Sequence, residues 1–330
     1  ALGAGLKFRD GWLALRCNFA TIEEKRVIDR RVGRTLTSEE AKILAKAVNR
    51  NVKLEGAEFV FKATVGHRGV LVIKDYAIGR LSADISNLDP AYRRLGRIAV
   101  AARSDATFLE DVKPLKDTPE ALRAASLVNE FAWKAHEVLK EHPINKERTS
   151  RGLLPANFIL MRDAGDSIPR VEPFHDKYGL KGIMLADMPV ELGIAKVLNL
   201  DVEKYRPERT IGSYMSRALG AAKNLELYDF VYVHLKGPDE PGHDGDFNGK
   251  VKEIEQIDRW FFGKFLDLIN LDDVVIVVTC DHATPWAEKK HTDDPVPLLI
   301  VAPPIKPSFL GKFSEKHAKE GGLGVIKGYE

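Results

Sequence analysis

The sequence has 330 residues, 44% of them apolar and 30% charged, with 26 glycines and 17 prolines. This composition is typical of a folded protein of two domains, and it excludes a collagen-like chain, a disordered chain and a disulfide-rich scaffold. The two cysteines, Cys17 and Cys280, indicate a reducing, cytoplasmic compartment, and we expect Cys280 to be a core residue at a strand end. No apolar run approaches the roughly 20 residues that span a bilayer, so no membrane partner is expected.

The net charge of +2 does not suggest a nucleic-acid partner, but the charge is unevenly distributed. Residues 1–100 carry 19 basic and 11 acidic side chains, a net charge of +8, whereas the remainder carries a net charge of −6. A basic part beside an acidic part suits an anionic small-molecule substrate on the first and metal cations on the second. Uneven surface charge without a function is an equally weighted alternative.

The first part of the chain has the pattern of a small α+β unit. Strands are predicted at Trp12–Phe19, Glu58–Ala63 and Val70–Lys74, and a helix at Thr37–Asn49, which begins with a capping sequence. The unit is expected to end near Lys116–Thr118, where a loop gives way to a long helix.

The second part alternates between helical and strand patterns, which predicts an α/β fold with a parallel sheet covered on both sides. Helices are expected at Thr118–Glu141, Ser213–Leu225 and Lys250–Leu268, and the third should bury Val251, Ile254, Ile257 and Phe261 on one face. The predicted strands are Ala156–Met161, Lys181–Ala186, Phe230–Leu235, Val274–Thr279 and Val296–Val301.

Aspartate and histidine residues follow two of these strands. Asp239 and His243 lie in the loop after one strand, Asp281 and His282 follow another, and His291 comes nine residues after His282. Ligands of parallel sheets bind beyond the carboxyl ends of the strands, and carboxylate with imidazole suits Mn²⁺ or Zn²⁺. The joint pattern predicts a site for two ions, although each Asp-His pair alone is compatible with an ordinary turn.

These motifs support a resemblance to a known family. Asp239-x-x-x-His243, Asp281-His282-x-Thr284-Pro285 and His291-x-x-Asp294-Pro295 together resemble the metal site of the alkaline phosphatase superfamily. Within that superfamily, the sequence is most similar to the archaeal-type 2,3-bisphosphoglycerate-independent phosphoglycerate mutases. Further similar segments are Asn18–Thr21, Asp29–Arg34, Gly66–Arg68, His142–Asn145 and Gly321–Gly324.

The resemblance implies an alkaline-phosphatase-like parallel-sheet metal domain with a smaller inserted α+β substrate domain. Residues 1–12 would be a remnant of the metal domain, 13–117 the inserted substrate-binding domain, and 118–330 the metal-binding domain. It implies that Asp239, His243 and His291 bind one divalent ion, Mn²⁺ or Zn²⁺, and that Asp281 and His282 bind a second. The implied activity is the glycolytic and gluconeogenic interconversion of 3-phosphoglycerate and 2-phosphoglycerate through a phosphoserine intermediate. The sequence does not indicate an oligomeric state.

The family's nucleophilic serine, and an aspartate that completes the second metal site, lie upstream of the segment that Ala1–Gly5 resembles. No serine of this sequence is therefore assigned as the nucleophile. We expect the intact protein to be longer, because a chain that lacks a central strand would expose unpaired strand edges and fold poorly.

Basic residues of the first part are candidates for binding the substrate, because guanidinium groups fit phosphate and carboxylate in bidentate geometry. A solvated basic turn is the alternative for the arginine loop. At Tyr92 the family has a histidine, and near Glu191 it has a lysine, for which Lys181 is a weak substitute. Another metal-dependent phosphohydrolase or phosphomutase of the superfamily, and a non-catalytic metal-binding fold, remain alternative functions. The candidates are Asn18, Arg30, Arg31, Arg34, His67, Arg68, Arg93, Arg94 and Lys181.

Overall fold

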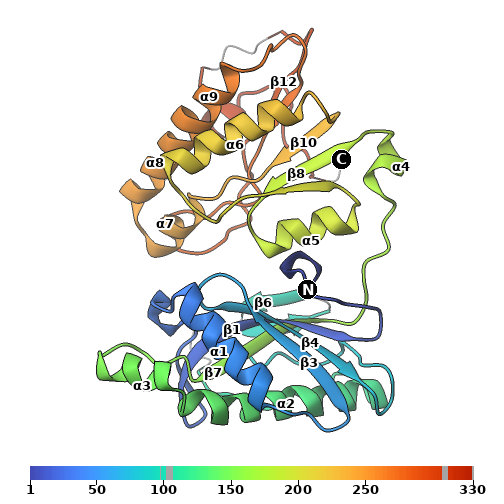
Figure 1. The fold of residues 1–330 in the computed structure, drawn as a ribbon. Helices are drawn as coiled ribbons and strands as arrows, with labels where there is room; N and C mark the ends of the chain where they lie inside the picture. The colour runs from blue at the N-terminus through green and yellow to red at the C-terminus, as the bar shows by residue number, and fades with distance from the viewer. Residues whose placement is uncertain (97, 102–106, 307–310, 329–330) are drawn as a thin grey trace. The chain divides into compact units, whose positions relative to one another are not determined.

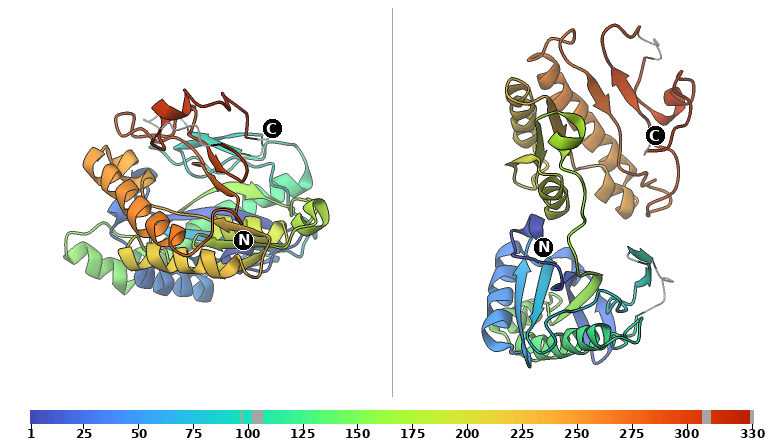
Figure 2. Two further views of the ribbon diagram at one scale, coloured as in Figure 1. Left: turned by 90° about the horizontal axis from the view of Figure 1, so that it is seen from above. Right: turned by 90° about the vertical axis from the view of Figure 1, so that its right-hand side faces the viewer.

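The computed structural model describes the chain except residues 97, 102–106, 307–310 and 329–330, and it describes 98–101 by backbone alone. The chain forms two compact units (Figures 1 and 2). The first comprises Ala1–Glu172 with Leu192–Leu198, and the second comprises Pro173–Glu191 with Asn199–Glu330. Each unit is described by itself.

The first unit is built on a five-stranded antiparallel sheet of order β2-β1-β4-β3, with β7 paired to β1. Its helices α1 and α2 pack against one face of this sheet (Figure 1). A β5–β6 hairpin lies outside the sheet. The strands are β1 (Leu13–Glu23), β2 (Arg26–Asp29), β3 (Ala57–Ala63), β4 (Arg68–Asp75), β5 (Tyr92–Leu95), β6 (Ile98–Ala101) and β7 (Phe158–Gly165), and the helical segments are η1 (Leu2–Ala4), η2 (Val32–Arg34), α1 (Ser38–Asn51), α2 (Pro119–Lys140) and α3 (Pro143–Ser150).

The central strand β1 shows why this sheet has two different faces. Leu13, Leu15, Cys17 and Phe19 alternate along β1 and are buried against α1 and α2. Helix α1 begins as predicted, with a capping box in which Thr37 and Glu40 satisfy each other's backbone amides. The residues between the buried ones point to the other face of the sheet, which is therefore free to carry polar groups.

The boundary between the units lies after Glu172, not near residue 117 as the sequence suggested. The reason is that α2 buries Leu127, Phe131 and Ala135 completely in the core of the first unit. The strand predicted at Ala156–Met161 is β7, and it pairs antiparallel with β1 instead of joining the parallel sheet.

The second unit contains a parallel sheet of order β10-β8-β9, against which α6 packs. The α/β fold class is confirmed, but β11 and β12 pair antiparallel with each other, which corrects the parallel arrangement expected for them. The strands are β8 (Gly182–Ala186), β9 (Asp201–Lys204), β10 (Phe230–Val233), β11 (Ile276–Val278) and β12 (Leu299–Val301). The helices are α4 (Phe174–Tyr178), α6 (Ile211–Asn224), α7 (Asp239–Asp244), α8 (Phe247–Gln256), the π-helix η3 (Ile257–Phe262), α9 (Gly263–Leu266) and α10 (Glu315–Ala318). Helix α5 (Pro189–Val197) is divided, because its residues from Leu192 on belong to the first unit.

Two burial predictions for this unit are wrong. Phe261 is buried as expected, but Val251 and Ile254 on the same predicted face are 37% and 50% exposed. Cys280 is also exposed, because it lies beyond the end of β11, where Val277 itself is 59% exposed. Among the described residues, no helix is both long and apolar enough to cross a membrane.

Candidate metal centre and anion site

Helix α7 places the first two candidate metal ligands. Asp239 begins this helix and His243 follows four residues later, so both side chains lie on the same helix face. Gly242 lets the helix approach the loop that follows β11, because a Cβ at this position would lie 2.5 Å from the Thr284 carbonyl oxygen. The glycine therefore brings α7 close to the loop that carries the other candidate ligands.

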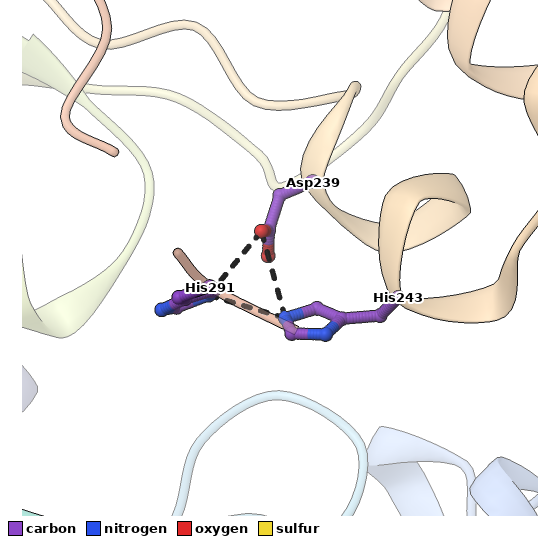
Figure 3. Close-up of side chains that lie close together, drawn as sticks. All are labelled: Asp239, His243 and His291. Atoms are coloured by element: carbon purple, nitrogen blue, oxygen red, sulfur yellow. Dashed lines mark hydrogen bonds and ion pairs between the residues drawn. The ribbon is translucent and has the colours of Figure 1, made fainter. Parts of the chain in front are cut away.

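Asp239, His243 and His291 converge on one point, as Figure 3 shows. Asp239 Oδ1 lies 3.6 Å from His243 Nε2 and 3.4 Å from His291 Nε2, and the two imidazole nitrogens are 3.1 Å apart. His243 Nδ1 lies 3.0 Å from the Lys289 carbonyl oxygen, a contact that fixes the tautomer with a lone pair on Nε2. Two nitrogens and one carboxylate oxygen in this arrangement fit a divalent transition-metal ion.

The electrostatics of the cluster favour the ligating protonation states. Burial alone would raise the pKa of Asp239, but the hydrogen bond donated by Thr284 Oγ1 at 2.7 Å and the nearby histidines hold that pKa below its usual value. Desolvation, followed by the neighbouring His282, lowers the pKa of His291. An ionised carboxylate beside neutral imidazoles is the form that a metal ion requires.

Asp281 and His282, the candidates for a second ion, lie beside this cluster. The His282 ring stacks on that of His291 with centroids 3.7 Å apart, and His282 Nδ1 lies 3.1 Å from Thr284 Oγ1. His282 Nε2 lies 3.4 Å from Asp281 Oδ2. Within the described part of the chain, only Asp239, His243 and His291 form a group of at least three such ligands.

A second polar cluster at the carboxyl end of β10 was missed by the sequence analysis. Lys236 Nζ lies 3.0 Å from Glu191 Oε1, and His234 Nε2 lies 3.6 Å from the same oxygen. Glu191 is buried, and its other oxygen has no hydrogen-bond partner among the described residues. The position of Lys236 directly after a parallel strand was the signal that could have identified it.

Lys181 is not brought to these groups. It precedes β8, its backbone amide donates to Asp229, and its ammonium lies 4.3 Å from the centre of the Tyr228 ring. It is therefore at the amino ends of β8 and β10, whereas Asp239 follows the carboxyl end of β10.

In the first unit, the predicted arginine loop follows β2 in a strained turn. Val32, Gly33 and Arg34 all have left-handed backbone conformations, with φ of 55°, 58° and 58°. Asp29 Oδ1 accepts hydrogen bonds from the amides of Arg31 and Gly33 at 2.7 and 2.9 Å. The Asp29 carboxylate thus folds the turn back on itself.

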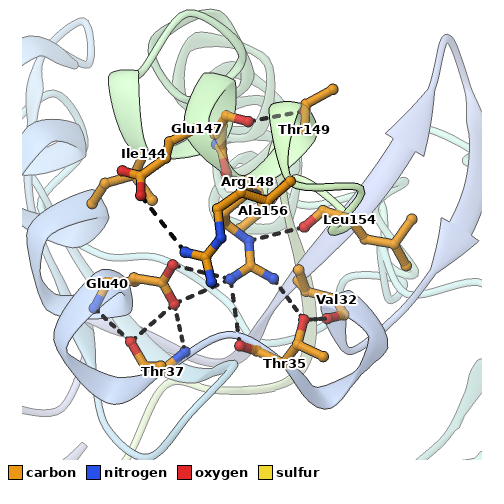
Figure 4. Close-up of polar contacts among 12 residues, drawn as sticks. Val32, Thr35, Thr37, Glu40, Ile144, Glu147, Arg148, Thr149, Leu154 and Ala156 are labelled. Carbon is orange, nitrogen blue, oxygen red and sulfur yellow. Dashed lines mark hydrogen bonds and ion pairs between the residues drawn. The ribbon is translucent and has the colours of Figure 1, made fainter.

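The buried side chain of Arg148 contacts Thr35, directly after this turn (Figure 4). Its guanidinium donates to Thr35 Oγ1 at 2.7 Å, to both Glu40 oxygens at 3.1 Å, and to the Leu154 carbonyl oxygen at 3.0 Å. Arg148 thereby joins the arginine turn to the first turn of α1 and to α3.

The predicted basic residues differ in how their side chains are used. Arg30 makes a bidentate ion pair with buried Asp89, at 2.8 and 2.5 Å, so its charge is compensated. Arg31 and Arg68 make no side-chain hydrogen bond or ion pair with any residue that the structure describes, so their donors remain for a ligand.

The remaining candidates of the first unit fall into two groups. Arg94 donates to the Ala164 carbonyl oxygen at 3.1 Å and so fastens β5 to β7, while Arg93 is an exposed residue of the same strand. Desolvation and then the charges of Arg68, Arg31 and Arg34 lower the pKa of His67 to about 4. His67 therefore lies among the arginines as a neutral imidazole. Asn18 is 7% exposed and its Oδ1 has no partner among the described residues.

Comparisons with known proteins identify the family of this chain. A family profile of 2,3-bisphosphoglycerate-independent phosphoglycerate mutases matches residues 1–145, and a profile of the metalloenzyme superfamily matches residues 140–330. The 2,3-bisphosphoglycerate-independent phosphoglycerate mutase of Aeropyrum pernix is 47% identical over 338 residues, covering 99% of this chain and 79% of that protein. The chain belongs to this phosphoglycerate mutase family.

Other phosphoglycerate mutases and solved structures extend the comparison. The 2,3-bisphosphoglycerate-independent phosphoglycerate mutase of Methanopyrus kandleri is 42% identical over 334 residues, which cover 99% of this chain and 75% of that protein. A Pyrococcus horikoshii protein superposes with a TM-score of 0.72 at 30% identity, over 98% of this chain and 72% of that one. The cofactor-independent phosphoglycerate mutase of Thermoplasma acidophilum superposes with a TM-score of 0.57 at 30% identity, over 98% of this chain and 76% of that one.

Membership of both families assigns this chain a metal-dependent phosphoglycerate mutase activity on a small-molecule substrate, as the resemblance implied.

Proposed function

We propose that Asp239, His243 and His291 bind one divalent ion, Mn²⁺ or Zn²⁺, and that Asp281 and His282 contribute to a second, in the interconversion of 3-phosphoglycerate and 2-phosphoglycerate. The observation that carries this proposal is the convergence of the first three side chains, with ligand atoms 3.1 to 3.6 Å apart. Bound ions would neutralise phosphoryl oxygens and stabilise the attacking and leaving oxygens of the transfer.

The first unit supplies the basic groups for the substrate. Arg31 and Arg68 offer guanidinium groups that no described carboxylate pairs with, and the pKa of His67, lowered by desolvation and by the nearby arginines, makes it a neutral donor or acceptor. Phosphoglycerate carries a phosphoryl group and a carboxylate, both of which guanidinium groups bind well. We assign substrate binding to this unit and metal binding to the second unit. The cytoplasmic location inferred from the cysteine content stays a prediction.

The test measures metal content and product together. The full-length protein, with the upstream segment expected to carry the nucleophilic serine, is stripped with a chelator, reloaded with Mn²⁺ or Zn²⁺, and assayed for 2-phosphoglycerate formed from 3-phosphoglycerate. His291→Ala should lose bound metal and mutase activity, whereas His175→Ala, which removes an exposed histidine of α4, should retain both. Full activity of His291→Ala would contradict the metal assignment, and release of free phosphate as the main product would favour a phosphohydrolase.

A further inference from the structure

Thr284 lies between the two groups of candidate metal ligands. The residue is buried, with 4% of its surface exposed, and its hydroxyl oxygen contacts one residue of each group. Oγ1 lies 2.7 Å from Oδ1 of Asp239, a candidate ligand of the first ion. It also lies 3.1 Å from Nδ1 of His282, a candidate ligand of the second. One hydroxyl group therefore joins the two ligand sets.

The hydroxyl group of Thr284 has a single proton, and its neighbours determine where that proton points. A carboxylate that ligates a metal ion is ionised and can only accept a hydrogen bond. The proton must therefore point at Asp239 Oδ1, because two oxygens 2.7 Å apart with no proton between them would repel each other. The second contact of Oγ1 can then form only if His282 donates an N–H from Nδ1.

This direction of hydrogen bonding determines the tautomer of His282. A neutral imidazole carries one proton, so an N–H at Nδ1 leaves the lone pair on Nε2. The His282 Nε2 atom lies 3.4 Å from Oδ2 of Asp281, the other candidate ligand of the second ion. His243 has the same arrangement in the first group, since its Nδ1 contacts the Lys289 carbonyl oxygen at 3.0 Å. In both histidines, a contact at Nδ1 leaves Nε2 for the ion.

The surroundings of Thr284 hold the hydroxyl group in place. Lys250 Nζ, on α8, donates to the Thr284 carbonyl oxygen at 3.1 Å and to the Pro238 carbonyl oxygen at 3.2 Å. Pro238 directly precedes Asp239, so one ammonium group ties together the two backbone segments. The Thr284 methyl group packs against α7, where a Cβ on Gly242 would lie 3.1 Å from it. Because a β-branched side chain has few χ1 rotamers, this packing also restricts the direction of Oγ1.

The spacing of the two ligand sets matters for the chemistry. Phosphoryl transfer by two ions needs them about 3.5–4 Å apart, so that the attacking and leaving oxygens are stabilised together. Asp239 and His282 lie in loops that follow different strands, β10 and β11. A hydroxyl group shared by the two side chains fixes their spacing directly.

We propose that Thr284 is a positioning residue that couples the two metal sites. Its hydroxyl group orients the Asp239 carboxylate and holds His282 as the Nδ1–H tautomer. This inference rests on the proposed function, which assigns these ligands to two ions.

The first measurement is the tautomer of His282 in the metal-free, full-length protein. Two-bond ¹H–¹⁵N correlation spectra of histidine-labelled protein distinguish Nδ1–H from Nε2–H, at a pH of about 8.5, where unperturbed carboxylates are ionised and imidazoles neutral. The signal of His282 is the one that is absent from His282→Gln. We expect Nδ1–H in the wild type and in Thr284→Ser, and loss of this preference in Thr284→Val. An Nε2–H tautomer in the wild type, or an unchanged Nδ1–H tautomer in Thr284→Val, would overturn the proposal.

The second measurement is the affinity for Mn²⁺, by calorimetric titration of the same metal-free protein. Thr284→Val is nearly isosteric but lacks the hydroxyl group. We expect it to weaken both binding steps by about tenfold or more, whereas Thr284→Ser should stay within about threefold of the wild type. The matched control is Thr279→Val, which removes a hydroxyl group that donates to the Pro297 carbonyl oxygen at 3.1 Å, and it should change neither step.

The outcomes separate this inference from the proposed function. Weakening of a single binding step, or equal affinities in Thr284→Val and the wild type, would refute the coupling. A wild type that binds two ions but carries His282 as the Nε2–H tautomer refutes this inference alone. A wild type that does not bind two ions refutes the proposed function, and the tautomer in the metal-free protein then still decides whether Thr284 positions His282.

Discussion

Replacement of Arg148 by methionine should both destabilise the first unit and loosen the arginine turn. Arg148 is 1% exposed, and its guanidinium donates to Thr35, Glu40 and Leu154. Methionine has a similar volume but offers no donor, so the carbonyl oxygens of Thr35 and Leu154 lose their charged partner. Removing one member of a buried pair costs about 3–5 kcal/mol. Glu40 is 24% exposed and keeps its hydrogen bonds with Thr37, so we expect a loss near the lower end, about 3 kcal/mol.

The measurement is urea unfolding of Arg148→Met against Arg151→Met. Arg151 is the residue directly after the same helix. Its side chain is 62% exposed, and its ion pair with Glu147, at 3.6 Å, lies in solvent, so its replacement should lower the unfolding free energy by less than about 0.5 kcal/mol. Amide hydrogen exchange should quicken at residues 32–35 in Arg148→Met, and its KM for 3-phosphoglycerate should rise. Unfolding free energies of the two variants within about 1 kcal/mol of each other would refute the reasoning.

The same ion pair has a pH signature. Burial alone would raise the pKa of Glu40, but hydrogen bonds from Thr37 and the Arg148 guanidinium hold that pKa below its ordinary value of 4.5. The contribution of the ionised carboxylate is present above pH 4.5 and is lost as the pH falls through the lowered pKa. The stability difference between wild type and Arg148→Met should therefore shrink over that acidic range, and a constant difference would argue against the pair.

Three further predictions concern other residues. The pKa of His67 is lowered from 6.5 to about 4, so the folded state favours its neutral form. The wild type should therefore lose stability relative to His67→Gln as the pH falls from 6.5 to about 4. Parallel curves of unfolding free energy against pH for the two proteins would show that His67 is not desolvated. Gly242→Ala places a Cβ 2.5 Å from the Thr284 carbonyl oxygen, so it should move α7 and weaken Mn²⁺ binding at least tenfold, as measured by calorimetry. The control Gly212→Ala, at a position with open space around it, should leave Mn²⁺ affinity unchanged. Arg217→Met should lower the unfolding free energy by about 3–5 kcal/mol by leaving Asp187 buried and unpaired, and Asp187→Asn in the same chain should recover part of this loss; purely additive effects would contradict a buried pair.

Several elements could be predicted from the sequence because their signals are local. The capping sequence at Thr37 and the proline at the start of α2 mark helix ends through contacts within one turn. The candidate metal ligands Asp239, His243 and His291 could be singled out because they follow strands whose carboxyl ends carry binding loops. By contrast, the pairing of β7 with β1 could not be predicted, because hydrophobic periodicity reports burial and not the partner or direction of a strand. Hydrophobic periodicity also does not reveal which sheet the apolar face of α2 covers. The sequence therefore assigned α2 to the second part of the chain, whereas it packs in the first unit.

The arginines of the first unit show why neighbours in the sequence are an incomplete guide to neighbours in space. Arg30, Arg31 and Arg34 stand out because they are adjacent in the chain, yet the charge of Arg30 is compensated by Asp89, a residue far away in the sequence. Arg16 and Arg162 carry no local signal, since each is the single arginine of its strand. Strand register alone puts them opposite each other, and the bulge at Asp163 keeps a carboxylate on the same face. Two like charges brought opposite each other in this way are therefore visible only after the strand register is known.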